Sequence, residues 1–130
     1  YQALLAADAC VVPLAAGSRN SIEGLHRAVD LIEGIASAHN PDLRFLAGLL
    51  NFFDKRLLVC REALEYLHST TFGAEQLFAQ RLSRNTAYQK AEAAGLTVLE
   101  YYDYKANAVT RAIRNLAGEL RRRLGDDHAH

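Results

Sequence analysis

Apolar residues in the first part of the chain change from a continuous run to helical spacing and back. The run ACVVPL, with residues 10–14 at its core, carries no charge and predicts a strand buried on both faces. A turn at Gly17 and Ser18 follows, and Asn20 with Glu23 three residues later predicts a helix that begins with a capping box. The helical stripe comprises Ile22, Leu25, Val29, Ile32 and Ala36, and His39-Asn40-Pro41 ends it.

The same alternation continues to the end of the chain. Residues 45–53 predict a second strand, and a helical stripe then runs through Leu57, Cys60, Leu64 and Leu67 toward Gly73. Residues 76–82 predict a third strand with a weaker pattern. A short helix over 86–94 is expected to stop at Gly95, and residues 97–99 are expected to be extended. The last helix carries the stripe Val109, Ile113, Leu116, Leu120 and Leu124 and ends at Gly125.

The order of these elements indicates the fold class. Strands that alternate with helices favour an α/β fold, here a three-layer parallel sheet flanked by helices. The chain has 130 residues, of which 50% are hydrophobic and 23% are charged, which is typical of one globular domain with its own core. Residues 1–125 are therefore expected to form that domain, and residues 126–130 a mobile tail.

Polar residues follow each of the three predicted strands. The stretches are GSRN (17–20), NFFDKR (51–56) and SRNT (83–86). The carboxyl ends of parallel strands meet at one edge of the sheet, where α/β proteins bind ligands, so these three tips should converge. The side-chain amide of Asn51 can both donate and accept hydrogen bonds, which suits a planar heterocycle. The pattern indicates a base-binding rim, with ordinary polar loops as the alternative.

Four segments, in order, resemble the ParA/MinD family of P-loop ATPases with a deviant Walker A motif. They are ALLAADACVVPLAAGSRNSIEGLHRAVDLI (3–32), AGLLNFFDKR (47–56), RLSRNTAYQKAEAAGLTVLEYYDYKANA (81–108) and AVTRAIRNLAGELRRRL (108–124). The resemblance extends from residue 1 to about residue 124.

This resemblance implies a Rossmann-like P-loop NTPase fold, of which residues 1–125 would be the C-terminal half. It also implies an ATP- and Mg²⁺-dependent homodimer that binds DNA non-specifically and works with a ParB-like partner in plasmid or chromosome partitioning. Such a protein would be cytoplasmic and nucleoid-associated. The residues bordering adenine would be Asn51, Ser83, Arg84 and Asn85. Several positions depart from the family pattern: Ser83 replaces a usual proline, Ala87 a frequent basic residue and Lys90 a common glutamate. The Gln or Glu positions that follow the first strand are here Ala15, Ala16 and Gly17.

The chemistry of phosphate binding is missing from these 130 residues. There is no GKT or GKS stretch and no glycine-rich loop after a strand, although P-loop catalysis needs backbone N–H groups and a lysine around the phosphates. The resemblance places the Walker A and Walker B segments before the position that matches Tyr1. Alone, the chain is therefore expected to hold part of an adenine pocket, with no ATP or Mg²⁺ bound and no catalytic residue.

Charge indicates a second candidate surface. Lys and Arg total 15, as do Asp and Glu, but the last helix carries Arg111, Arg114, Arg121, Arg122 and Arg123 against one acid, Glu119. A basic helix face is typical of contact with DNA phosphates, and a solvated face is the alternative. The candidate DNA-binding residues are Arg56, Arg84, Arg111, Arg114, Arg121 and Arg122.

Two other functions stay open. A degenerate ParA-like domain would be a non-enzymatic interaction module, and a MinD-like positioning ATPase would bring its last helix to a membrane. No stable membrane association is expected, because the apolar stripe of the last helix is narrow and matches the need to cover a sheet. No stretch reaches the roughly 18 apolar residues of a membrane span either. Cys10 and Cys60 are expected to be buried thiols, and no metal site is indicated. The tyrosines at 101, 102 and 104 are expected to pack against the last helix, or else to stack on bases.

Overall fold

The computed structural model describes residues 2–69 and 74–125 of the chain. Their elements, in order, are α1 (Gln2–Ala6), β1 (Ala9–Ala15), α2 (Arg19–Ala38), β2 (Arg44–Asn51), α3 (Leu58–Ser69), the 3₁₀ turn η1 (Ala74–Gln76), α4 (Thr86–Ala93), α5 (Val98–Tyr101) and α6 (Ala108–Gly125). The predicted end of the third helix at Gly73 and the predicted mobile tail lie outside the described residues.

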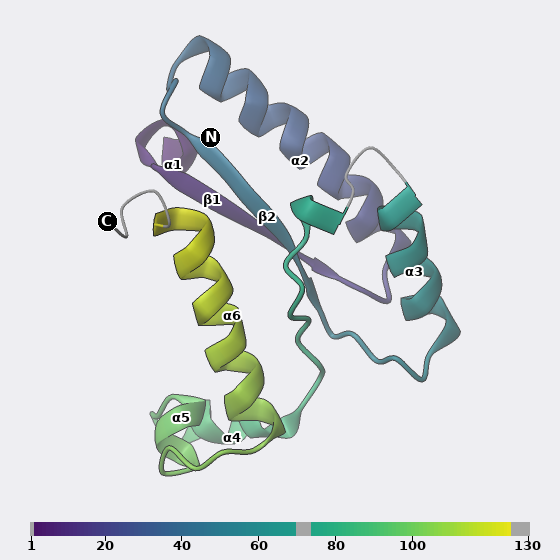
Figure 1. The fold of residues 1–130 in the computed structure, drawn as a ribbon, viewed down its shortest axis with the longest axis vertical. Helices are drawn as coiled ribbons and strands as arrows, with labels where there is room; N and C mark the ends of the chain where they lie inside the picture. The colour runs from purple at the N-terminus through teal and green to yellow at the C-terminus, as the bar shows by residue number, and fades with distance from the viewer. Residues whose placement is uncertain (1, 70–73, 126–130) are drawn as a thin grey trace.

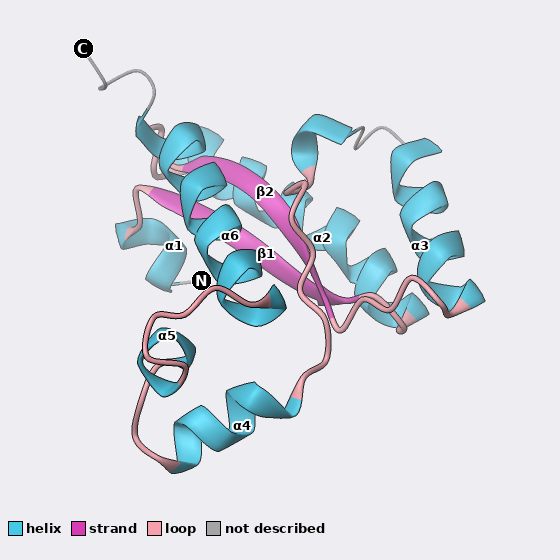
Figure 2. Ribbon diagram, turned by 60° about the horizontal axis from the view of Figure 1, so that its bottom comes forward, coloured by secondary structure: helices cyan, strands magenta, loops and turns pink. Residues whose placement is uncertain are grey.

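The centre of the molecule is a parallel pair of strands, β1 and β2, joined through α2. Helices α2 and α3 cover one face of this sheet, and α6 crosses the other (Figure 1). Helices α4 and α5 lie beside the N-terminal end of α6, away from the strands (Figure 2). The mixed α/β class and the layering of helices on both faces agree with the prediction. The sheet itself has two strands rather than three among the described residues.

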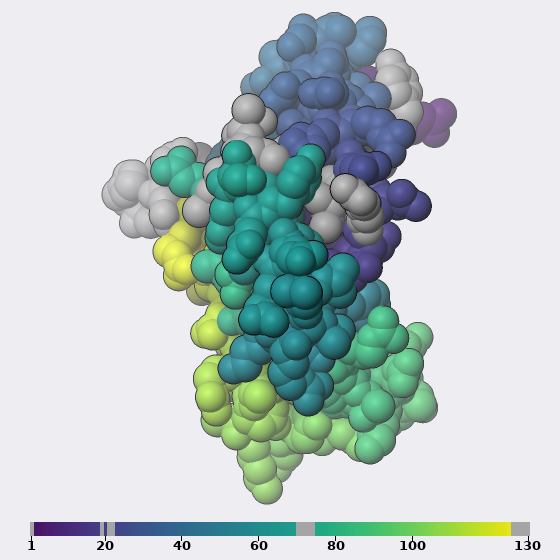
Figure 3. All heavy atoms as spheres, turned by 90° about the vertical axis from the view of Figure 1, so that its right-hand side faces the viewer, coloured from purple at the N-terminus to yellow at the C-terminus, as the bar shows by residue number. Residues whose placement is uncertain are grey.

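The main core lies between the sheet and the two helices α2 and α3. Its buried members are Leu14, Ala16, Leu25, Val29, Leu50, Cys60, Ala63, Leu67 and Leu77. Ile32, Ile35 and Leu43 form a second cluster at the other end of α2. Burying these side chains supplies the main driving force for docking the helices. Helix α3 is the outermost element on the face seen in Figure 3. Two of its large side chains, Leu58 and Tyr66, are at least half exposed.

Strand β2 carries a bulge at Leu46. Cys10 pairs with Phe45 and Val11 with Ala47, so Leu46 has no residue opposite it on β1. A bulge leaves backbone groups that need other partners. Here the guanidinium of Arg123, from α6, donates to the Leu46 carbonyl at 3.0 Å. It also donates to the carbonyls of Glu75 at 2.7 Å and Leu77 at 2.9 Å.

The prediction of a third strand over 76–82 is wrong in its regularity. Gly48 forms one parallel bridge with Leu77, and the N–H of Phe78 donates to the Gly48 carbonyl. A regular parallel ladder would next join the N–H of Gln80 to the Leu50 carbonyl. Instead the N–H of Leu82 donates to Leu50, which leaves two surplus residues in the segment.

The surplus residues are held by Glu119 of α6. One carboxylate oxygen accepts from the N–H of Ala79 at 2.9 Å and the other from the N–H of Gln80 at 2.7 Å. Asn115 also donates from its side-chain amide to the Gln80 side chain at 3.1 Å. Asn115, Glu119 and Arg123 are spaced by four residues and therefore share one face of α6. That face ties the irregular segment 75–80 to the sheet.

The predicted helices agree closely with α2, α3, α4 and α6, with two corrections. Helix α2 begins at Arg19, so Asn20 lies inside the helix and is not its cap. Of residues 97–99, Thr97 has the predicted extended backbone, whereas Val98 and Leu99 are helical, because Thr97 and Glu100 form a reciprocal capping box that starts α5. The stop at Gly95 is confirmed by its φ of +72°, a conformation that favours glycine.

Cys60 is buried and Cys10 partly buried, and both are free thiols. Burial raises the pKa of the Cys10 thiol.

Within the described residues, no helix combines the length and the apolar character needed to cross a membrane.

Replacing Arg123 by alanine should lower the free energy of unfolding by about 2–4 kcal/mol, because three carbonyls lose a charged donor. Urea unfolding followed by circular dichroism measures this change. Arg121, which is exposed on the same helix, provides the control, and its alanine variant should stay within about 0.5 kcal/mol of the parent. Equal effects of the two substitutions would contradict the role given to Arg123.

Candidate functional site

The three polar tips that follow the strand-like segments meet at one edge of the sheet. Ala15 pairs with Asn51 at the ends of β1 and β2, and the N–H of Ala16 donates to the Asn51 carbonyl at 2.9 Å. The N–H of Phe53 donates to the Leu82 carbonyl at 2.9 Å, which brings residues 83–85 alongside. The predicted convergence is therefore present, although the third segment is not a regular strand.

A groove of about 570 Å³ opens at this edge. It is lined by Phe53, Asp54, Lys55, Arg56, Ala79, Gln80, Arg81, Ser83 and Arg84. We call it the rim groove. Of the predicted adenine-bordering residues, Ser83 and Arg84 line the groove, whereas Asn51 and Asn85 do not. The geometry thus brings part of the predicted set together in one hollow.

Two arginines stack on the aromatic rings at the end of β2. The guanidinium carbon of Arg84 lies 4.8 Å from the centre of the Phe52 ring, and that of Arg81 lies 5.0 Å from the centre of the Phe53 ring. Phe52 has a φ of +56° and its side chain is 45% exposed. A bulky residue in the left-handed region costs roughly 1–2 kcal/mol. Backbone strain of this kind is concentrated at functional sites, so Phe52 is a candidate for contact with a ligand.

The two asparagines at this edge use their carbonyl oxygens internally. Oδ1 of Asn51 accepts from the N–H of Phe52 at 2.8 Å. Oδ1 of Asn85 accepts from the N–H of Ala87 at 2.8 Å and thereby caps α4. The amino groups of both side chains remain as donors, and the Arg84 guanidinium and the Ser83 hydroxyl add further donors, although the hydroxyl can also accept. The edge therefore suits a ligand that is rich in hydrogen-bond acceptors.

Asp54 and Arg56 form an ion pair inside the rim groove. The Arg56 side chain donates to both carboxylate oxygens of Asp54 at 2.9–3.0 Å, and its backbone N–H donates a further bond at 2.9 Å. These bonds favour the ionised acid and lower the pKa of Asp54 from 3.8 to about 2. The pair offsets the charge of Arg56, so this residue is a weaker candidate for DNA contact than the sequence indicated.

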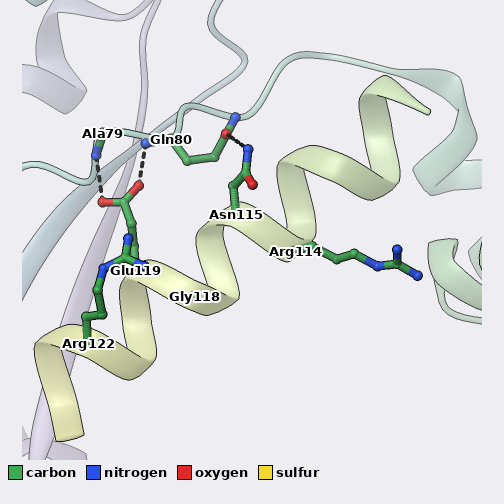
Figure 4. A pocket seen from close by; sticks show the side chains of 7 residues that line it. All are labelled: Ala79, Gln80, Arg114, Asn115, Gly118, Glu119 and Arg122. Atoms are coloured by element: carbon green, nitrogen blue, oxygen red, sulfur yellow. Dashed lines mark hydrogen bonds between the residues drawn. The ribbon is translucent and has the colours of Figure 1, made fainter. Parts of the chain in front are cut away.

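A second groove of about 580 Å³ lies between α6 and the segment 79–80 (Figure 4). It is lined by Ala79, Gln80, Arg114, Asn115, Gly118, Glu119 and Arg122. We call it the basic groove. Arg111 and Arg121 are exposed on the same side of α6, as their spacing from Arg114 and Arg122 requires. Four of the predicted DNA-contacting arginines thus form one stripe, which we call the arginine stripe.

Arg123 does not belong to that stripe. Its guanidinium donates to backbone carbonyls and lies 5.1 Å from the centre of the Phe78 ring, so it faces the sheet. Sequence reasoning also missed the role of Glu119 and counted it only as an isolated acid. The four-residue spacing of Asn115, Glu119 and Arg123 was the available signal.

Other sequence candidates are placed as follows. Tyr101 and Tyr104 are exposed, and the rings of Tyr101 and Tyr102 meet edge to face at 5.2 Å. Arg114 donates to the Tyr104 carbonyl at 3.2 Å, which joins this turn to α6. Ala87 is 2% exposed, so its position cannot offer a basic side chain to solvent. Among the described residues, no group of His, Cys, Asp and Glu side chains is arranged to hold a metal ion.

Comparison with known proteins gives partial similarities. No family model matches the chain. The chromosome-partitioning ATPase Soj of Thermus thermophilus is 30% identical over 122 residues, which are 94% of this chain and 47% of Soj. Two proteins of Pseudomonas putida described as uncharacterized, one of them from the gidB 3′ region, are each 33% identical over 121 residues, 93% of this chain and 44% of theirs. The chain therefore spans about half the length of the curated relatives it matches.

The Asp54–Arg56 pair gives a pH-dependent prediction. Because the folded pKa of Asp54 is lowered, the pair's contribution to stability is complete above the ordinary value of 3.8 and is lost as pH falls toward about 2. An NMR titration of the Asp54 carboxyl should show a midpoint near 2, and replacing Arg56 by alanine should raise it toward 3.8. A midpoint that does not move in this variant would show that Arg56 is not the cause.

Proposed function

We propose that this chain is the C-terminal part of a ParA-like ATPase that partitions DNA, plasmid or chromosome. In this proposal the edge at Asn51 and residues 83–85 contacts adenine, and the arginine stripe of α6 contacts DNA. ATP and Mg²⁺ would be held together with a phosphate site that residues 1–130 do not supply. A homodimer formed on ATP binding and a ParB-like partner belong to the same proposal.

The observation that carries the proposal is the meeting of Asn51 and Arg84 at one strand edge, beside the rim groove. Ligands of open parallel sheets bind at such an edge. The similarity to Soj over 94% of this chain supports the same assignment. A polar groove alone would not favour this function, because polar loops are common, and neither would a distant similarity alone. The two observations together favour it.

The chemistry of the edge suits a purine. Adenine presents acceptor nitrogens on its ring, and the edge presents the donors of Asn51, Ser83 and Arg84. The exposed Phe52 ring offers a surface on which a base can stack, and Arg84 already lies over that ring. These residues would bind and orient the base, and none of them has a part in phosphate transfer.

The arginine stripe suits the backbone of duplex DNA. Its members are exposed and they lie along one side of α6. The net charge of the chain is zero, so attraction to DNA would come from this local stripe. Binding of that kind reads no base sequence, as non-specific DNA binding requires.

One test of this proposal concerns the contact with the base. In an NMR titration of the labelled chain with adenosine, the amide signals of residues 51–53 and 83–85 should shift. Asn51→Ala should weaken binding by about 1–2 kcal/mol, because one hydrogen-bonding amide is lost. Gln89→Ala, which removes an exposed amide from α4, is the matched control and should bind as the parent does. Unchanged affinity in the Asn51 variant would remove this residue from the proposed site.

Another test of this proposal concerns the contact with DNA. The double variant R114Q/R122Q should bind a fluorescent duplex more weakly, and the slope of log affinity against log salt should fall by about 0.9 for each phosphate that the variant no longer neutralises. The double variant R27Q/R61Q removes the same charge from exposed positions on α2 and α3. If both double variants weaken binding equally, only overall charge matters and the arginine stripe is not the binding surface.

A further inference from the structure

The rim groove and the basic groove share a wall. Ala79 and Gln80 line both of them, and Glu119 lines the basic groove from the α6 side (Figure 4). The backbone N–H groups of these two residues are the donors that the Glu119 carboxylate accepts. A single side chain therefore holds the wall between the two candidate surfaces.

The hydrogen bonds of Glu119 lie where the segment departs from a regular ladder. With two surplus residues between Phe78 and Leu82, it is Leu82 that bonds to Leu50 and Phe53. Arg81 and Arg84 consequently reach the Phe53 and Phe52 rings. The two surplus residues thus set which side chains reach the rim, and the N–H groups of Ala79 and Gln80 in this stretch are bound by Glu119.

A second register is available to the segment. If the N–H of Gln80 were released, it could donate to the Leu50 carbonyl, as a regular parallel ladder requires. A displacement by two residues keeps each side chain on its face of the sheet, so the apolar pattern would not oppose it. Residues 83–85 would then be drawn along β2 by roughly 7 Å, two residues of extended chain.

We propose that Glu119 is a positioning residue that fixes the rim by holding segment 79–80 in its displaced register. The charge of its carboxylate makes it suited to this task, since hydrogen bonds to an ionised acceptor are stronger than neutral ones. The two-point grip needs both oxygens, and a glutamine has only one that accepts. The consequence for adenosine binding rests on the proposed function, whereas the effect on the position of residues 81–85 does not.

The test compares Glu119→Gln with Asn115→Ala by NMR. Asn115 lies one turn earlier on α6 and bonds to the Gln80 side chain, so its variant removes a contact with the segment while leaving the backbone grip intact. In E119Q, the amide signals of residues 81–85 should shift, those of the core residues Leu25 and Leu67 should not, and adenosine affinity should fall roughly five-fold or more. In N115A, the signals of residues 81–85 should stay near their parent positions.

The outcomes separate the two proposals. Shifted rim signals in E119Q without any response to adenosine, in parent or variant, would support the positioning role and contradict the proposed function. Adenosine binding with unmoved rim signals in E119Q would overturn the positioning role alone. If E119Q does not fold, the test uses the parent chain. Scalar couplings should then be observed across the hydrogen bonds from the Ala79 and Gln80 amides to the Glu119 carboxyl carbon. Their absence would overturn the proposal.

Discussion

The fold depends on one face of α6 supplying hydrogen-bond partners to an irregular sheet. Strand β2 has a bulge at Leu46, and the segment beside it breaks its ladder at Ala79 and Gln80. The backbone groups at this bulge and this break have no strand partner, and those that are withdrawn from water need another one. Arg123 donates hydrogen bonds to the carbonyls of Leu46 and Leu77. The Glu119 carboxylate accepts hydrogen bonds from the N–H groups of Ala79 and Gln80. Helix α6 therefore supplies hydrogen bonds that a regular third strand would form in an unbroken sheet.

This arrangement separates two kinds of polar residue on a single helix. Asn115, Glu119 and Arg123 face the sheet and the segment 75–80, while the arginine stripe lies on the adjoining side of α6. The helical repeat of 3.6 residues makes this division possible, since Asn115, Glu119 and Arg123 follow one another at intervals of four residues and so form one row along the helix. A helix of this kind can hold the fold with one row of charges and present the other to a partner.

The sequence was sufficient for the elements whose periodicity is local. The continuous apolar run around Val11 predicted a strand, and the apolar stripes of α2 and α6 predicted helices, because the positions in a stripe recur every third or fourth residue. The edge where Asn51 lies was predictable from the topology of parallel strands. The regularity of residues 76–82 was not predictable, because the break depends on Glu119, 39 and 40 residues further along the chain. Arg123 was counted with the surface charges for the same reason, whereas the capping box of Thr97 and Glu100 was a local signal that was overlooked.

The most direct test of the grip by α6 is native-state hydrogen exchange of the parent chain, followed amide by amide. The account predicts that Ala79 and Gln80, although they lie outside any helix or ladder, exchange as slowly as Phe78 and Leu82, which bond to β2. Exchange of Ala79 and Gln80 as fast as that of exposed loop residues such as Lys55 would contradict it.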